Sequence, residues 1–184
     1  MRVRPRTDRS LEEIARLLDE NGIPWAVFAG AAAHAYGASR PLTDVDILVP
    51  RAEGDRVAAL FPEARIVRHD EIQVVVLPGF DIVAGLHNMD LDAEMAARRT
   101  RHEIAGVVVP VIPAEDNILL KGLMGRGPEE GKHDWEDVAA MMAHLPALDW
   151  AYLCRRAGQC GPRDRVAGVL ARLEGMWGER SRGE

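Results

Sequence analysis

The chain has 184 residues, of which 47% are hydrophobic and 28% are charged, and its formal net charge at pH 7 is −6. This length and composition indicate a folded globular protein with a substantial core and exclude a disordered or fibrous chain. The negative charge also argues against broad, sequence-independent wrapping of nucleic acid, which depends on phosphate neutralisation by lysine and arginine.

The sequence carries no sign of export or membrane insertion. No apolar segment follows its basic first ten residues, and no run approaches the roughly 18 apolar residues that a membrane span needs. Cys154 and Cys160 are the two cysteines of the chain, and we expect both to be reduced thiols because they form neither a disulfide framework nor a CxxC pair. We therefore expect a cytoplasmic protein that does not contact a membrane.

The first elements in chain order are a helix, a strand and a short second helix. Ser10 and Glu13 have the spacing of a capping box, and leucine and isoleucine recur at helical intervals up to about residue 20. Residues 25–28 are typical of a short buried strand, which runs directly into the small-residue stretch AAAHAYG. A strand that leads directly into a helix N-terminus makes an anion site near Gly30 possible.

A second strand at residues 44–49 carries the pattern Asp-Val-Asp. Residues two apart on a strand point to the same face, so the carboxylates of Asp44 and Asp46 converge there. Two converging anions repel each other unless a cation lies between them, and Mg²⁺ is a hard cation that prefers carboxylate oxygens. The pattern alone is weak, because on a solvent-facing strand edge it has no function.

A third carboxylate lies further along, in a region where we expect one helix and three strands (53–60, 64–67, 72–77 and 80–83). Asp81 lies in the last of these strands between Phe80 and Ile82. Burying an unpaired charge costs several kcal/mol, so a metal ion or a cationic partner is the economical explanation for this aspartate. The alternative is an exposed position at the strand edge, just after a Pro-Gly turn.

The remainder of the chain is mainly helical. We expect helices at 90–99, 113–124, 132–143, 149–157 and 163–176, with two short strands or one hairpin at 102–112 and a frayed end. The last 34 residues hold seven arginines against four acids, which favours a solvated helix face over a binding surface for a polyanion. The resulting fold class is α/β (α+β): a short mixed sheet with packed helices in residues 1–112, and a helical region in residues 113–184.

Three stretches resemble the minimal nucleotidyltransferases related to the AbiEii toxin, over roughly residues 10–145. FAGAAAHAYGASRPLTDVDILV resembles their first motif, and FDIV is similar to the strand that bears their third carboxylate. PAEDNILLKGLMGR followed by KHDWEDVAAM resembles their helix with an embedded lysine and a downstream Lys-Asp-x-x-Asp element. Ala29 departs from the pattern, because it stands where a glycine is usual and alanine disfavours a positive φ.

The resemblance implies a role for individual residues and a fold like that of these transferases. It makes Asp44, Asp46 and Asp81 the catalytic carboxylates, which would hold Mg²⁺ or Mn²⁺. The residues that would bind the nucleotide are Gly30, Ala31, Arg40, Thr43 and Lys121, with Asp134 and Asp137 in support. Without the resemblance, Lys121 is a snorkelling side chain, and Asp134 and Asp137 cap their helix or pair with Arg126 or Lys132.

The activity that the resemblance implies is transfer of a nucleoside monophosphate from an NTP to an acceptor. The sequence leaves the acceptor open among tRNA or another RNA, a protein and a small molecule, because fold and metal site do not determine it. Two alternatives remain. One is a nucleotide-binding module that has lost catalysis, which Ala29 motivates, and the other is a toxin-type protein that binds a cognate antitoxin-like partner.

Overall fold

The computed structural model describes residues 9–86 and 89–183 of the chain. One mixed sheet lies at its centre, with the strand order β3-β4-β5-β2-β1-β7-β6. Its strands are β1 (Ala26–Phe28), β2 (Val45–Val49), β3 (Arg65–His69), β4 (Ile72–Leu77), β5 (Phe80–Ala84), β6 (Thr100–Ile104) and β7 (Val107–Val111). The expected mixed α/β fold is confirmed.

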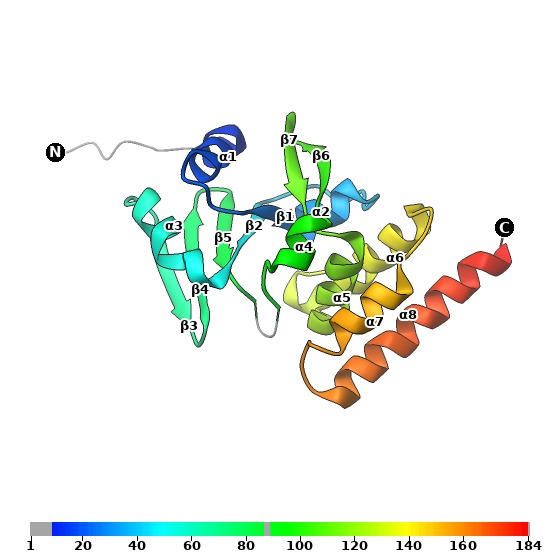
Figure 1. Cartoon of the computed structure of the whole chain (residues 1–184). Helices are drawn as coiled ribbons and strands as arrows, with labels where there is room; N and C mark the ends of the chain where they lie inside the picture. Colours follow the sequence, from blue (N-terminus) through cyan, green and yellow to red (C-terminus); the bar gives the residue numbers. More distant parts are fainter. Residues whose placement is uncertain (1–8, 87–88, 184) are drawn as a thin grey trace.

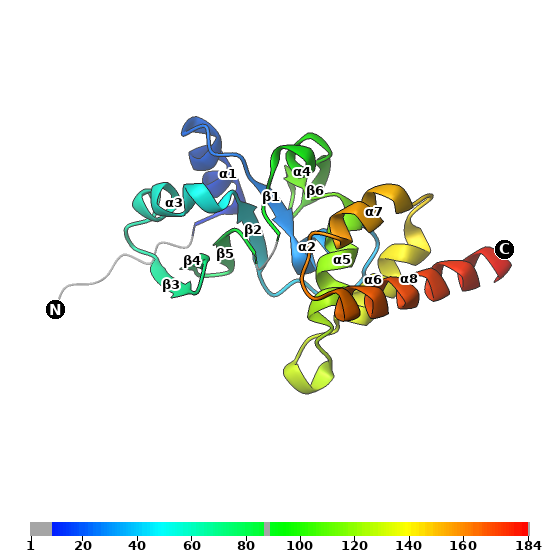
Figure 2. The same ribbon diagram turned by 60° about the horizontal axis from the view of Figure 1, so that its bottom comes forward.

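Helices surround this sheet and form the C-terminal part of the molecule. They are α1 (Leu11–Glu20), α2 (Ala29–Ala35), α3 (Gly54–Leu60), α4 (Ala93–Ala97), α5 (Ala114–Met124), α6 (Asp134–His144), α7 (Trp150–Ala157) and α8 (Arg163–Gly183), with short 3₁₀ turns at Arg51–Glu53 and Pro128–Glu130. Figures 1 and 2 show β3 to β5 at one end of the molecule and α5 to α8 at the other. No helix in the described part of the chain is long and apolar enough to cross a membrane.

Strand β2 is central to the arrangement because it pairs on both sides. It runs antiparallel to β1 and parallel to β5, and β4 then pairs antiparallel with β5. Because cross-strand neighbours point to the same face of a sheet, the residues opposite one another on these strands lie side by side on that face.

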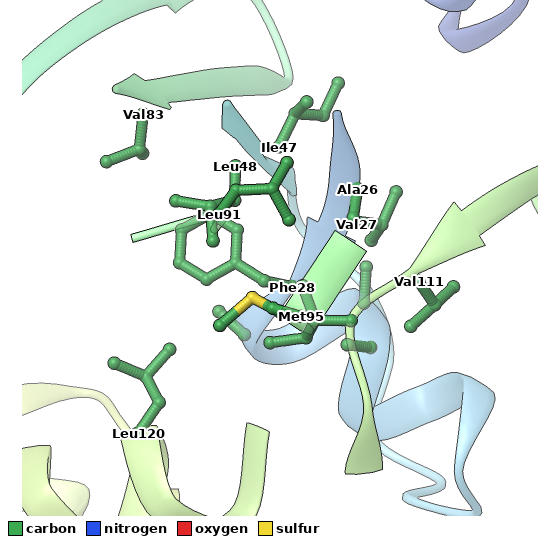
Figure 3. Close-up of a cluster of buried hydrophobic side chains, with 14 of the residues drawn as sticks. Ala26, Val27, Phe28, Ile47, Leu48, Val83, Leu91, Met95, Val111 and Leu120 are labelled. Atoms are coloured by element: carbon green, nitrogen blue, oxygen red, sulfur yellow. The ribbon is translucent and has the colours of Figure 1, made fainter. Parts of the chain in front are cut away.

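A single hydrophobic core joins the two parts of the chain. The cluster of buried residues runs from Leu11 in α1 to Leu173 in α8 and includes most of β1, β2 and α5. Figure 3 shows a portion of it, in which Leu48 and Leu120 belong to the same group of side chains. Residues 1–112 and 113–184 therefore differ in secondary structure but bury their apolar side chains together.

Most of the expected local structure is present. The Ser10 hydroxyl accepts a hydrogen bond from the Glu13 N–H, and the Glu13 carboxylate accepts one from the Ser10 N–H, which completes the capping box. The stretch expected to be two strands or a hairpin is the hairpin of β6 and β7, with Ala105 and Gly106 both at positive φ in its turn. Local patterns were sufficient for these elements.

The helix expected at residues 90–99 is much shorter, because two aspartates bind main-chain N–H groups before it begins. The Asp90 carboxylate accepts hydrogen bonds from the N–H groups of Arg51 and Leu91, and Asp92 caps the helix by accepting from the N–H of Met95. Asp90 therefore stabilises the loop before α4 and is not part of the helix. The expectation of a frayed end is also wrong as far as Gly183, the last residue of α8.

The expectation of a solvated arginine face is wrong for Arg156. Its side chain is buried and forms ion pairs with Asp116 of α5 and Asp92 at the start of α4. The Tyr152 hydroxyl donates a 2.5 Å hydrogen bond to the same Asp116. This network ties α7 to α5 and α4, so Arg156 holds the C-terminal helices to the rest of the protein.

Candidate active site

Asp46 and Asp81 lie opposite each other on neighbouring parallel strands. They are register partners on β2 and β5, so both side chains point to the same face of the sheet. Asp44 immediately precedes β2 and is exposed, and its Oδ1 accepts a hydrogen bond of 2.8 Å from the Thr43 hydroxyl. The sequence-predicted carboxylates thus lie on and beside two adjacent strands, although 35 residues separate Asp46 from Asp81.

The two facing aspartates ionise less readily than ordinary carboxyls. Burial raises the pKa of Asp46 to about 6, and the nearby charges of Asp44 and Asp81 add to the shift. Burial and the charge of Asp44 likewise raise the pKa of Asp81. The site therefore holds more negative charge than its own cations offset, and an added cation would stabilise it.

The donor set suits a hard divalent cation. Carboxylate oxygens are the ligands that Mg²⁺ and Mn²⁺ prefer. The pKa of Asp46 is raised mainly by burial, and the charges of Asp44 and Asp81 add to the shift, so a cation beside these carboxylates would offset their repulsion. Within residues 9–86 and 89–183, however, no three His, Cys, Asp or Glu side chains already converge as a metal site. The facing pair Asp46 and Asp81 fits the ion, whereas the full three-aspartate set predicted from the sequence stays a prediction.

The first residue of α2 has the conformation that the glycine usual at this position would provide. Ala29 adopts a φ of 53°, in the left-handed region that is unfavourable for alanine by about 1–2 kcal/mol. Its N–H donates a 2.8 Å hydrogen bond to Oδ1 of Asn117, and Asn117 Nδ2 donates one of 3.1 Å to the Ala29 carbonyl. Asn117 is fully buried on α5. Its amide therefore holds Ala29 in place from both sides.

Sequence reasoning did not identify Asn117 as a site residue. The sequence held one indication, because the amide of Asn117 directly precedes the apolar run Ile118 to Leu120 within a predicted helix. A buried amide requires hydrogen-bond partners, but the sequence does not indicate that these lie 88 residues away at Ala29.

Two small residues follow in the first turn of α2. A Cβ added at Gly30 would meet no atom within 4 Å, so this glycine leaves open space rather than serving the packing. Ala31 is fully buried in the core and does not line the neighbouring pocket. Of the two residues predicted to contact the nucleotide here, Gly30 lies at the pocket.

The pocket beside Asp46 has a volume of about 150 Å³. It is lined by the start of α2, the segment from 38 to 46, Lys121 of α5, and the segment from Arg126 to Asp137. Both parts of the chain therefore build it. A larger cavity, of about 500 Å³, lies between α1 and the β6–β7 hairpin, and it contains none of the residues predicted for the site.

Lys121 is not a free cation facing the pocket. Its Nζ is 2.7 Å from Asp137 Oδ2 and 3.1 Å from Asp134 Oδ1, and all three side chains are buried. Arg40 adds two hydrogen bonds to Asp137, and Arg126 adds an ion pair to Asp134. We call these five residues the α5–α6 charge cluster. The expected direct contact of Lys121 with phosphate stays a prediction, while its structural partners are now clear.

The carboxylates of this cluster are stabilised in their charged form. Burial alone would raise the pKa of Asp134 and Asp137, but hydrogen bonds from Arg126 and Arg40 and the charge of Lys121 outweigh it and lower both. These acids thus differ from Asp46, whose pKa is raised. The pocket is therefore lined both by Asp134 and Asp137, whose charges are neutralised by neighbouring cations, and by Asp46, whose pKa is raised.

Lys132 is a second residue that sequence reasoning did not place in the site. It lines the pocket, it is exposed, and its positive charge acts on both Asp46 and Asp81. Within the described part of the chain its ammonium has no hydrogen bond or ion pair. It is therefore available to an anion in a way that Lys121 is not.

Comparison with known proteins identifies the family of the chain and agrees with its fold. The sequence matches the family described as uncharacterised nucleotidyltransferase over residues 6–178. The fold is similar to an antigenic nucleotidyltransferase-like protein from Paracoccidioides brasiliensis, with 19% identity, a TM-score of 0.52, and coverage of 92% of this chain and 87% of the other. It is also similar to the antibiotic-resistance factor ANT(2'')-Ia, with 16% identity, a TM-score of 0.51 and 94% coverage of both chains. No curated protein sequence matches the chain.

Proposed function

Because the chain belongs to the family of uncharacterised nucleotidyltransferases, we propose that it transfers a nucleoside monophosphate from an NTP to an acceptor hydroxyl. A bond forms between the acceptor oxygen and the α-phosphorus, the bond from that phosphorus to the β-phosphate oxygen breaks, and pyrophosphate leaves. The single observation that carries the proposal is the opposition of Asp46 and Asp81 on β2 and β5. Asp46 also lines a pocket that contains Lys132, an exposed lysine without a partner among the described residues.

Asp44 and Asp46 would hold Mg²⁺ or Mn²⁺ with the triphosphate, and Asp81 would complete the metal site. The ion, when bound, supplies charge neutralisation for the phosphates and lowers the pKa of a coordinated hydroxyl. Asp81 would also accept the proton of the acceptor hydroxyl.

Two groups at the pocket would receive the phosphates. The main chain at Gly30 lies beside open space, so a phosphate can approach it closely. Lys132 would offset the triphosphate charge, because its ammonium is exposed and has no partner among the described residues. This assignment gives Lys132 the role that the sequence resemblance gave to Lys121.

The α5–α6 charge cluster would position the site rather than bind the phosphates. Lys121 joins α5 to α6 through Asp134 and Asp137. Arg40, which shares Asp137, fixes the segment that leads to Asp44. Through these contacts the cluster sets the relation between the carboxylate strands and the helical wall of the pocket.

The narrower likeness to AbiEii-type toxins is a second proposal. It is supported by the stretch that resembles the Lys-Asp-x-x-Asp element, in which His133 stands at the lysine position and Asp134 and Asp137 lie together beside Lys121. A toxin of this type would act on an RNA and bind an antitoxin-like protein. An inactive module is less well supported, because Ala29 takes the conformation of the glycine that it replaces.

Transfer from α-labelled NTP tests the proposal. Each NTP is incubated with Mg²⁺ and with tRNA, total protein or a panel of hydroxyl-bearing small molecules, and both the labelled product and pyrophosphate are measured. We expect transfer by the wild type, and a loss of at least a hundredfold in Asp46→Asn and Asp81→Asn. Asp164→Asn, an exposed acid on α8, is the matched control. Equal transfer by Asp46→Asn and wild type would contradict the mechanism.

A further inference from the structure

A second hollow lies between the sheet and the helical part and differs chemically from the nucleotide pocket. It has a volume of about 390 Å³. We call it the apolar groove, and six of its lining residues define it: Ile72, Leu86, Met89, Leu120, Leu123 and Met124. These come from β4, from the chain after β5 and from α5, so the groove joins the two ends of the molecule seen in Figure 1.

An apolar strip connects this groove to the candidate catalytic carboxylate. Ile72, Val74 and Val76 alternate along β4 and therefore share one face of the sheet. Val76 is the register partner of Asp81 on β5, so that face also carries the carboxylates. The strip covers about 13 Å at the usual rise of a strand. All three of its side chains are half-buried, which leaves them accessible to a ligand.

The strip and the nucleotide pocket lie on different sides of Asp81. In the sheet order, β4 flanks β5 on one side, while β2 and β1, which lead to Ala29 and the pocket, flank it on the other. An acceptor must reach the α-phosphorus from a side that the nucleotide does not fill. The strip is such an approach, and it ends in the groove.

We propose that the apolar groove and strip bind the body of the acceptor, and that the acceptor is an extended, largely apolar alcohol rather than a polycation or a nucleic acid. This inference rests on the proposed nucleotidyl transfer and specifies its second substrate. The length of the strip requires a molecule of more than about 13 Å, with its hydroxyl at the Asp81 end.

The charges around the groove support this choice. None of the described residues that line the groove is acidic, and the charged residue among them is Arg165. Its guanidinium donates a hydrogen bond to the Leu123 carbonyl. A polycation would find no carboxylate among the described residues of the groove. A nucleic acid would find two separate arginines, Arg165 in the groove and Arg65 opposite Val76 on β3, rather than a basic surface. Each methylene buried in such a groove improves affinity by about fourfold.

Binding of matched alkyl glucosides tests the inference without knowledge of the natural acceptor. Methyl, hexyl and octyl β-glucoside carry the same hydroxyls and differ only in their apolar tail. With ¹³C-labelled methionine methyl groups, Met89 and Met124 report occupancy of the groove by NMR. With saturating Mg²⁺ and NTP present, we expect octyl glucoside to shift both methionine signals and to bind with at least tenfold higher affinity than methyl glucoside. Tobramycin, a polycation that also carries hydroxyls, should leave both signals unmoved.

Two lysine substitutions locate the binding. Val76→Lys, in the strip, and Leu123→Lys, in the groove, are each expected to weaken octyl glucoside binding at least tenfold. Val108→Lys is the matched control, because Val108 is an exposed apolar residue on β7, outside the groove.

Three results would overturn the inference: Met89 and Met124 signals that octyl glucoside leaves unmoved, an affinity for tobramycin equal to that for octyl glucoside, or displacement of octyl glucoside by NTP. Calorimetric titration of NTP into the same samples separates the two proposals. Failure of the wild type to bind NTP contradicts the proposed function, whereas normal NTP binding with an empty groove contradicts the acceptor class alone.

Discussion

The buried amide of Asn117 stabilises a main-chain conformation at Ala29 that normally requires glycine. A glycine would reach the left-handed conformation without strain, whereas Ala29 requires an external constraint. The buried amide of Asn117 supplies it with two hydrogen bonds, one to each polar group of the Ala29 main chain. Asn117 thus compensates for the alanine that stands at position 29 in place of the usual glycine.

The pair predicts a specific rescue. Asn117→Ala removes two buried hydrogen bonds, so we expect it to lower the free energy of unfolding by about 1–3 kcal/mol and to weaken NTP binding at least tenfold. Ala29→Gly alone should bind NTP as the wild type does. In the double variant, glycine reaches the same conformation without the amide, so most of the NTP affinity should return.

Ala35→Gly, at the other end of α2, is the control for this rescue, because Ala35 does not have a positive φ. Thermal unfolding and NTP titration measure both effects. If Ala29→Gly restores no more affinity to Asn117→Ala than Ala35→Gly does, Asn117 does not act through Ala29.

The raised pKa of Asp46 predicts that part of the protein's stability is lost as the pH rises. Its pKa is raised in the folded protein, to about 6, by burial and by Asp44 and Asp81. The folded state therefore binds this proton more tightly than the unfolded state does. The stabilisation is fully present below the ordinary aspartate pKa and is lost as the pH rises through about 6.

With a chelator present, Asp46→Asn should therefore exceed the wild type in free energy of unfolding at pH 8, by up to about 3 kcal/mol. Urea unfolding from pH 4 to pH 8 measures this difference, with Asp164→Asn as the exposed control. A difference between Asp46→Asn and wild type that shrinks as the pH rises would contradict the burial of an ionised Asp46.

Helix α5 is the element on which the site depends most. Asn117 contacts Ala29 at the start of α2, Leu120 lies in the core and at the apolar groove, and Lys121 pairs with α6. One helix therefore contacts the start of α2, the proposed acceptor groove and the helical wall of the pocket. Its displacement would disturb all three.

Substitutions of Lys121 and Lys132 are predicted to have different effects on stability and on NTP binding. Lys121→Met leaves two buried carboxylates short of their shared cation, so it should lower the free energy of unfolding by about 3 kcal/mol. Lys132→Met removes an exposed charge without a described partner, so stability should change by about 0.5 kcal/mol or less while NTP binding weakens at least fivefold.

Urea unfolding and NTP titration on both variants check this contrast. The reverse pattern, with a stable Lys121→Met that has lost NTP binding and a normal Lys132→Met, would return the phosphate role to Lys121. Because the pKa values of Asp134 and Asp137 are lowered, the stabilisation by Lys121 should be present at neutral pH and be lost as the pH falls below the ordinary aspartate range.

The elements that depend on near neighbours could be predicted from the sequence. The capping box at Ser10, the apolar run of β4 before its Pro-Gly turn and the acids in the first turn of α5 each lie within a few residues of chain. The helix at 90–99 was overestimated because its first residues are held by distant groups, and the N–H of Arg51 that binds Asp90 is 39 residues away. Contacts of this kind leave no local signal.

The same distinction applies to the candidate site. Asp44 and Asp46 were identified from their spacing, and Asp81 from its apolar neighbours. The roles of Lys121 and Lys132 could not be separated in that way, because both lie near acids in the sequence and only the packing of α5 on α6 decides which one is neutralised. Asn117 required its partner at Ala29.

At the scale of the whole molecule, the site is shared between the two parts of the chain. Asp46 and Asp81 come from the sheet and Gly30 from α2, while Lys132 and most of the α5–α6 charge cluster come from the C-terminal helical region. One hydrophobic core and the buried Arg156 network hold these parts together. Binding of an NTP between them is the step on which the proposed activity depends.

Calorimetric titration of each NTP with Mg²⁺ into the wild type and Asp46→Asn tests that step most directly, with circular dichroism to confirm that both proteins are folded. We predict that the wild type binds at least one NTP, that binding requires Mg²⁺, and that folded Asp46→Asn has lost it. A folded wild type that binds no NTP, or an Asp46→Asn variant that binds as tightly as the wild type, would contradict the account.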